Sequence, residues 1–246
     1  MNQYPYLTRY MSSLCKIPGG EFHRIVRLRG KDGLSHVRVR DFKLGKTPVT
    51  WGLWLEYCES TKTKHPDSPG WEIDLDDPVV NVSWQDIMKT NGFCTWVARE
   101  TGIQVSLPSQ CQWEYAATAG NIKNIYPWGA RFDSKKLWCS VEKQWDAKRT
   151  ASTIRTERIH YNQFRIADLV GNVGQWCFDF YTPDTDAELL PSAVRRKLLY
   201  RVIKGGGWHS NHSSMLNTRI NGWNHYQYCN DHTGFRLMAE PEHNRR

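Results

Sequence analysis

Six residues of types that bind transition metals or transfer protons are concentrated near the C-terminal end of the chain. They are His209, His212, His225, Cys229, Asp231 and His232. Imidazole, thiolate and carboxylate groups are the usual ligands of zinc, iron and copper. The His209 to His212 spacing has no matched second cluster, and a mixed polar surface also contains such residues. Two hypotheses stay open, a metal-dependent enzyme and a contact surface.

The composition around these residues favours the second hypothesis, a surface that contacts a ligand. From Gly205 to Arg236 there is no Lys and no Glu, although the whole chain holds 33 Lys and Arg and 25 Asp and Glu. Side chains of Tyr, Trp, His, Asn and Ser give amphipathic area and adaptable hydrogen bonds at low entropic cost. Lys and Glu lose more rotamer freedom when they are immobilised. The segment is therefore predicted to bind a macromolecule by shape and hydrogen bonding, since it carries little net charge.

The whole-chain composition is that of a globular protein, with 39% hydrophobic and 24% charged residues in 246. No stretch approaches the roughly 18 apolar residues of a membrane span, so no membrane partner is expected. The N-terminus lacks the pattern of an export signal, and the seven Cys show no CxxC spacing. We therefore expect reduced thiols and a cytoplasmic location.

Positive charge is concentrated in the N-terminal quarter, where residues 1–65 hold 12 Lys and Arg against 5 Asp and Glu. Between Arg24 and Lys46 a predicted hairpin turns at GKDG and alternates Val37 and Val39 with arginines. Nucleic acid or another acidic partner could bind such a basic face. A solvated edge hairpin is the alternative.

Three helices and a loop-rich second half must position these residues. Apolar spacing predicts a helix beginning near Thr47 or Thr50, and a capping box at Ser83 begins a second helix that continues to Gly102. A third lies between Pro108 and Gly120. Polar stretches at 142–165 and 182–200 are predicted insertions or long loops. The expected class is α+β in a single domain.

Eight short motifs occur in a recognisable order. They are IPGGEF (17–22), LGKTPVTWGLWLEYCE (44–59), PVVNVSWQDI (78–87), SLPSQCQWEYAATAG (106–120), YPWG (126–129), LVGNVGQW (169–176), YRVIKGGGW (200–208) and TGFRL (233–237). Together they resemble the formylglycine-generating enzyme, or sulfatase-modifying factor, family. The resemblance implies a C-type-lectin-like fold with few regular elements, covering 1–246 as one domain with residues 1–16 as an N-terminal extension.

The same resemblance argues against the family's oxidase activity. Oxidase members hold copper with two cysteines that follow the GGS-aromatic motif, because thiolates suit Cu(I). Here Ser210 and Met215 stand at those positions. The iron-dependent sulfoxide synthases also resemble this chain, but they take histidines from a separate helical domain. No catalytic residue and no required cofactor are therefore predicted; the alternative is a catalytically inactive or metal-dependent member of this superfamily.

Another branch with this fold is the variable protein of diversity-generating retroelements, whose C-terminal segment is rewritten by adenine-directed mutagenesis. The altered codons end in a pyrimidine, which excludes Lys, Glu, Gln, Met and Trp. Residues 205–237 match this pattern between GGGW and TGFRL, while Trp208, Met215, Trp223 and Gln227 would be fixed. The protein would then be cytoplasmic, or virion-associated if a phage encodes it. The predicted ligand-binding residues are His209, Ser210, Asn211, His212, Ser214, Asn217, Arg219, Asn221, Trp223, Asn224, His225, Tyr226, Tyr228, Asn230, Asp231 and His232.

The resemblance also concerns calcium and the scaffold. Family members often bind Ca²⁺ at the segment matching DLVGNVGQW, where the residues here are Asp168, Gly171, Val173 and Gln175. Gln stands where the family has Glu, so an occupied calcium site and a metal-free turn held by hydrogen bonds both stay open.

For a variable surface the scaffold must be fixed by residues outside the variable segment. We expect core strands at GGGW and GFRL, inward Trp208 and Phe235, and structural roles for Trp113, Trp128 and Trp176.

Overall fold

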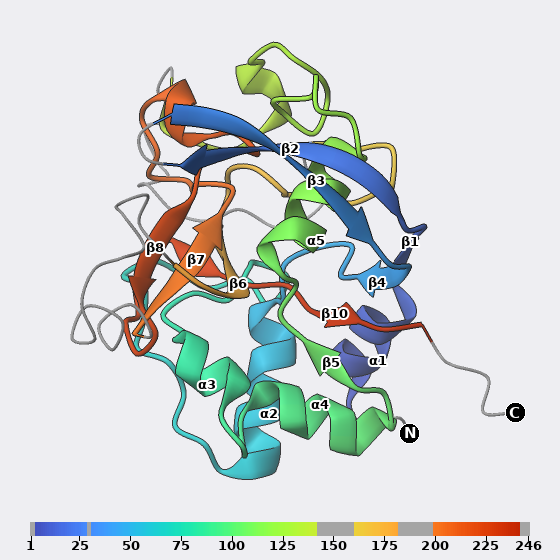
Figure 1. The fold of residues 1–246 in the computed structure, drawn as a ribbon. Coiled ribbons are helices and arrows are strands. Elements are labelled where there is room, and N and C mark those ends of the chain that lie inside the picture. Colours follow the sequence, from blue (N-terminus) through green and yellow to red (C-terminus); the bar gives the residue numbers. More distant parts are fainter. Residues whose placement is uncertain (1–2, 29–30, 142–159, 182–198, 242–246) are drawn as a thin grey trace, which may run out of the picture.

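Helices and short sheets alternate with long irregular segments in this chain, which confirms the predicted α+β class (Figure 1). The computed structural model describes residues 3–28, 31–141, 160–181 and 199–241. The predicted loops at 142–165 and 182–200 lie mostly outside the described residues. Among the described residues, no helix is long and apolar enough to cross a membrane.

The N-terminal residues are part of the core, which corrects the expectation of an extension at 1–16. Helix α1 (Pro5–Ser12) has its proline in the first turn, and Leu7 and Tyr10 are buried against α2. The Tyr10 hydroxyl donates to the carbonyl of Thr47 at 3.2 Å and accepts from the amide of Leu237 at 3.0 Å. The first helix therefore connects the two ends of the chain.

The predicted helices exist, with one correction. Helix α2 (Trp51–Thr61) follows Thr50, and α5 (Gln110–Thr118) begins with a capping box at Ser109. The predicted helix from Ser83 to Gly102 is instead two helices, α3 (Trp84–Met88) and α4 (Phe93–Thr101). A Cβ at Gly92 would lie 2.6 Å from the Asp86 carbonyl oxygen, so only glycine permits this turn. The apolar spacing in the sequence continues across this turn, so it did not reveal where one helix ends and the next begins.

Strands β2 (Gly20–Leu28) and β3 (Lys31–Val39) form the predicted antiparallel hairpin, paired from Gly20↔Val39 to Leu28↔Lys31. Lys31, Asp32 and Gly33 already belong to β3, so these three residues of GKDG are not the predicted turn, and residues 29–30 lie outside the described residues. The hairpin crosses above α5 in Figure 1.

Two four-stranded sheets complete the fold. The first has the order β1-β4-β10-β5, formed by Cys15–Ile17, Phe42–Leu44, Met238–Ala239 and Val105–Ser106. The second has the order β8-β7-β6-β9, formed by Gly222–His225, Tyr200–Lys204, Gly174–Phe180 and Thr233–Gly234. Strands β6 and β9 are parallel, and the other pairs in both sheets are antiparallel. Single turns of 3-10 helix occur at Ser134–Lys136 and Ser213–Met215.

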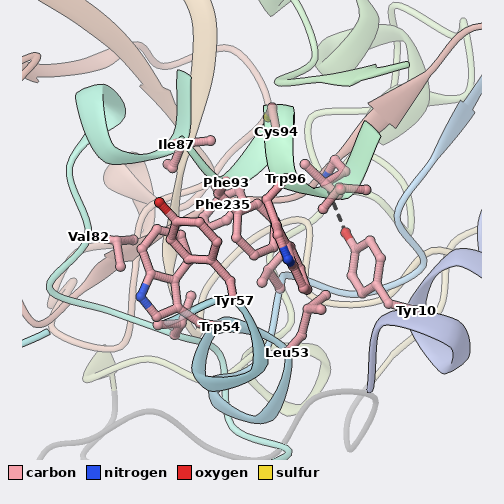
Figure 2. Packing of buried hydrophobic residues seen from close by; sticks show 14 of the residues in the cluster. Tyr10, Leu53, Trp54, Tyr57, Val82, Ile87, Phe93, Cys94, Trp96 and Phe235 are labelled. Atoms are coloured by element: carbon pink, nitrogen blue, oxygen red, sulfur yellow. Dashed lines mark hydrogen bonds between the residues drawn. The ribbon is translucent and has the colours of Figure 1, made fainter. Parts of the chain in front are cut away.

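Aromatic side chains from α2, α4 and the C-terminal chain interlock in the larger core cluster (Figure 2). Trp54 stacks on Phe93 with ring centroids 5.0 Å apart, and Phe235 meets both rings edge to face. Such pairs contribute about 0.5–1.5 kcal/mol each beyond their burial. Phe235 therefore points inward as predicted, and it fixes the chain directly after β9.

The GGGW segment is a turn and not the predicted strand. Strand β7 ends at Lys204, and Gly205 and Gly206 have φ of +91° and +62°, which a strand does not contain. Trp208 still points inward with 8% exposure. Trp113 and Trp176 are fully buried as expected, whereas Trp128 is half-buried and stacks on Tyr126.

Candidate ligand-binding face

The chain between Trp208 and Thr233 lies mostly at the surface. We call residues 209–232 the C-terminal face. Of its 24 residues, four are buried: Ser210, Leu216, Asn217 and Thr218. Fourteen of the sixteen predicted ligand-binding residues are exposed or half-exposed, namely His209, Asn211, His212, Ser214, Arg219, Asn221, Trp223, Asn224, His225, Tyr226, Tyr228, Asn230, Asp231 and His232. These fourteen side chains are accessible from solvent.

Ser210 and Asn217 do not lie on the exposed surface, which corrects their predicted role. The Ser210 hydroxyl accepts a hydrogen bond from the Gly207 amide at 3.2 Å. The Asn217 side chain accepts from the amides of Arg219 and Ile220 at 2.9 and 3.1 Å and donates to the carbonyl of Ser214 at 2.7 Å. A short amide side chain that bonds its own backbone nearby fixes a turn. These residues shape the loop from inside.

Both ends of the face are joined at Trp208. Its backbone amide donates to the carbonyl of Asn172 at 2.8 Å, and its indole N–H donates to the carbonyl of Asp231 at 2.9 Å. The Trp71 ring meets the Trp208 ring edge to face at 5.7 Å. A buried indole with its N–H satisfied is a stable anchor. The first and last residues of the face are therefore held together while the residues between them project.

Aromatic residues outside the predicted set extend the face. Trp223 is 51% exposed, stacks on Tyr181 at 5.4 Å and meets Tyr200 edge to face at 5.0 Å. Tyr181 and Tyr200 were missed because Tyr181 borders the predicted insertion at 182–200, Tyr200 ends it, and both lie outside 205–237. Register could have indicated Tyr200, which pairs with His225 across β7 and β8. Exposed Trp and Tyr are frequent energetic centres of protein interfaces.

The histidines do not form a metal centre. The rings of His209 and His232 are in contact with centroids 3.8 Å apart, and Asp231 Oδ1 lies 2.9 Å from His232 Nδ1. His212 instead bonds within its own turn, to Ser214. Among the described residues, no group of three or more His, Cys, Asp or Glu could hold a metal ion. Burial, and secondarily the charge of His232, lower the pKa of His209 from 6.5 to about 4.

Ser210 and Met215, which the resemblance matches to the family's copper ligands, do not form a donor set that suits copper. A Cβ at Gly206 would lie 2.7 Å from the Met215 carbonyl oxygen and 3.1 Å from Ser210 Oγ, so both residues border the same turn. The hydroxyl of Ser210 is already hydrogen bonded, and the Met215 side chain is 45% exposed. One hydroxyl and one thioether do not fit Cu(I), which prefers thiolates. No reaction step follows from these residues.

A group of buried charges lies directly beneath the face. The Lys204 ammonium is fully buried and donates to Glu114 Oε1 at 2.8 Å and to Asn221 Oδ1 at 2.9 Å. Arg24 of β2 pairs with the same carboxylate at 2.7 Å. Burial lowers the pKa of Lys204, and Glu114 opposes that shift. Asn221, an exposed residue of the face, therefore connects it to the charged centre of the scaffold.

The predicted calcium residues form a hydrogen-bonded turn. Gln175 is fully buried, and its Nε2 contacts the carbonyl oxygens of Asp168, Leu169 and Val173 at 2.7, 3.3 and 3.5 Å. Gly171, the fourth predicted residue, has φ of +78° and donates its amide to the carbonyl of Gly205. An amide N–H₂ repels a cation, so these donors do not fit calcium.

The predicted basic hairpin has one basic edge and one neutral inner face. Arg38 and Arg40 are exposed, whereas Arg24 faces α5 and is paired with Glu114. Arg38 and Arg40 line a groove of about 690 Å³ between β3 and the first turn of α5. Asp41 and Glu240 also line this groove, so its charge is mixed.

Comparison with known proteins agrees with this geometry. The model of the sulfatase-modifying factor enzyme 1-like domain matches residues 7–241. The chain belongs to this family. Because the match begins at residue 7, most of helix α1 is included in the family domain.

Members with different described activities are similar to this chain. An inactive C-alpha-formylglycine-generating enzyme 2 of Bos taurus is 29% identical over 201 residues, covering 76% of this chain and 59% of the relative. A formylglycine-generating enzyme of Thermomonospora curvata is 28% identical over 205 residues, covering 76% of this chain and 64% of the relative. The chain thus spans about three fifths of the length of these curated relatives.

A solved structure with the same fold is Treponema denticola variable protein 1. It superposes with a TM-score of 0.72 and 16% identity, covering 93% of this chain and 95% of that protein. At this identity the likeness concerns the fold. The predicted C-type-lectin-like fold of the formylglycine-generating enzyme type is therefore confirmed.

Proposed function

We propose that this protein is a non-enzymatic display protein of the diversity-generating retroelement type, which binds a macromolecular ligand through the C-terminal face. One observation carries the proposal. The segment without Lys or Glu is also the segment whose side chains mostly project from the surface. The residues that flank it, Trp208 and Phe235, are buried in the core. A surface that tolerates replacement needs this separation between variable side chains and fixed supports.

The buried members of the segment support the same proposal. Ser210 and Asn217 are residues that pyrimidine-ending codons permit, but their hydrogen bonds hold the backbone. Diversification is therefore expected at exposed positions such as Asn211 and Tyr228. Changes at Ser210 and Asn217 are expected to be selected against. Absence of the two thiolates at Ser210 and Met215 agrees with a protein that has lost oxidase chemistry.

Sequencing of the neighbouring DNA is the first test. A reverse transcriptase gene and a near-copy repeat of the segment encoding 205–237 are expected, with mismatches at adenines of the template. A neighbourhood without either element would contradict the retroelement origin, although it would leave ligand binding itself to be measured.

A library experiment tests the binding role directly. Positions 211, 212, 224, 226 and 228, which are exposed or half-exposed, are randomised with pyrimidine-ending codons, and the library is selected against purified lysozyme and streptavidin. A control library randomises an equal number of exposed positions in 62–68, remote in sequence from the face. Specific binders are expected from the first library. Equal yields from both libraries would contradict a dedicated binding face.

The alternative of a metal-dependent enzyme predicts a different result. An enzyme that uses His209, His225 or Cys229 requires a stoichiometric transition metal after purification without chelators. Elemental analysis decides this point, and one equivalent of iron, copper or zinc would overturn the non-enzymatic proposal.

We further propose that the hairpin is an attachment surface for an acidic partner. The exposed Arg38 and Arg40 along the groove at α5 motivate this proposal. Binding of a 20-mer of single-stranded DNA or of polyglutamate should weaken steeply with salt. No binding at 20 mM salt, or binding equal in the Arg38→Glu, Arg40→Glu variant, would exclude it.

A further inference from the structure

We propose that the scaffold beneath the C-terminal face is independent of calcium. The N–H groups of Gln175 and Arg236 bind the loop carbonyl oxygens that a calcium ion would otherwise coordinate. The relevant loop is 167–173, at the segment where the family resemblance implies calcium. This inference concerns the scaffold and stands whether or not the face binds a ligand.

The orientation of the Gln175 amide follows from its partners. Its Oε1 accepts from Trp113 Nε1 at 2.8 Å and from Arg236 Nε at 2.6 Å, and both of these groups can only donate. The Nε2 group must then face the carbonyls of Asp168, Leu169 and Val173. The amide therefore fills the side of the loop on which carbonyl oxygens converge.

Arg236 adds a permanent charge to the same group of oxygens. Its side chain is fully buried and donates to the carbonyls of Gly45, Ala167 and Asp168, each at 2.9 Å. A guanidinium stays protonated at neutral pH, so this buried side chain carries its positive charge among the carbonyl oxygens. A divalent cation placed among these carbonyls would meet the guanidinium at short range, and that repulsion disfavours binding.

The loop that Gln175 and Arg236 hold also contacts the start of the face. A Cβ at Gly205 would lie 2.5 Å from the carbonyl oxygen of Leu169, and the Gly205 carbonyl accepts from the amide of Gly171 at 3.0 Å. The Gln175 amide bonds the same Leu169 carbonyl at 3.3 Å. The turn after β7 thus packs on the loop whose carbonyls these side chains bind.

Thermal unfolding with and without calcium tests the wild-type protein. The Tm is expected to agree within about 1 °C in 1 mM EDTA and in 5 mM CaCl₂. A calcium ion that bound only the folded state would raise the Tm, so equal values indicate that none binds. Isothermal titration with CaCl₂ should show no stoichiometric heat. A Tm increase of about 3 °C or more in calcium, with saturable binding, would overturn the proposal.

The variant Gln175→Glu sharpens the test. It replaces the donor by a carboxylate oxygen that faces three carbonyls, which is an arrangement that calcium binds. The variant is expected to melt at least about 3 °C lower than wild type in EDTA and to recover part of that loss in CaCl₂ but not in MgCl₂. A variant as stable as wild type in EDTA would show that the amide donors contribute nothing, and this would also overturn the proposal.

The control is Gln104→Glu, which makes the same charge change at an exposed glutamine. It should melt like wild type in all three solutions. If Gln175→Glu does not fold under any condition, the wild-type titration still decides between the two outcomes.

Discussion

Two polar regions meet at the turn Gly205–Trp208, and they use similar residue types in opposite ways. Beneath the turn, Gln175, Lys204 and Arg236 are fully buried, and each forms hydrogen bonds to named partners. Beyond it, the C-terminal face leaves all but one of its Asn, His and Tyr side chains exposed or half-exposed. Buried polar groups rigidify a structure only when they are satisfied, whereas exposed ones exchange freely with water. The buried polar groups therefore fix the scaffold, whereas the exposed polar groups of the face are free to interact with water or with a ligand.

The largest expected effect is at Glu114. Glu114→Ala leaves Lys204 buried without its carboxylate and removes the partner of Arg24, so the variant should lose about 3–5 kcal/mol of unfolding free energy. Urea denaturation measures this loss. The control Asp67→Ala breaks an ion pair with Lys64 in which both side chains are over 80% exposed, and it should cost less than about 1 kcal/mol. Equal losses would contradict the difference between the regions.

A second prediction compares two asparagines of the face. Asn217→Ala removes three hydrogen bonds of a buried side chain, so the unfolding free energy should fall by about 1–3 kcal/mol. Asn211→Ala changes an exposed residue and should stay within about 0.5 kcal/mol of wild type. Thermal and urea unfolding distinguish them. If Asn217→Ala proved neutral, the loop would not depend on its internal bonds.

Acidification should act at the border between the regions. His209 is exposed as a residue, but its ring loses hydration where it contacts Trp208 and His232, which lowers the pKa of His209 to about 4, so the folded state favours the neutral ring. The corresponding stabilisation is complete above pH 6.5 and is lost as the pH falls toward 4. Wild type should therefore lose more Tm between pH 7.5 and 4.5 than His209→Asn does. His65→Asn, at an exposed position, should behave like wild type. An NMR titration midpoint near 6.5 for His209 would contradict this prediction.

The smallest effect is expected from changes confined to the face. The triple variant Asn211→Ser, Tyr228→Ser and Cys229→Ser alters only exposed side chains. Its unfolding free energy should differ from wild type by less than about 1 kcal/mol, because surface substitutions away from special contacts are nearly neutral. A loss greater than about 2 kcal/mol would mean that these side chains stabilise the scaffold, and the separation of the two regions would fail.

Local patterns predicted much of the fold. Apolar spacing located α2, the capping box at Ser83 located the start of α3, Pro108 and Gly120 bounded α5, and the ordered motifs indicated the family and its C-type-lectin-like fold. The same patterns failed in two places for different reasons. Gly92 breaks the second predicted helix between α3 and α4 through a local turn against the carbonyls of residues 86–89, across which the apolar spacing continues. Helix α1 belongs to the core because Tyr10 bonds both Thr47 and Leu237, and these contacts between distant segments have no local signature.

The sequence alone determined which residue types were available in the C-terminal segment, and so where the stretch without Lys or Glu lies. Only the tertiary structure decided which of these residues project. Ser210 and Asn217 turn inward, Tyr181 and Tyr200 join the face, and Gln175 contacts carbonyls together with Arg236. The reason is that composition acts locally, whereas burial and hydrogen-bond partners depend on segments that are distant in sequence and meet only in the folded chain.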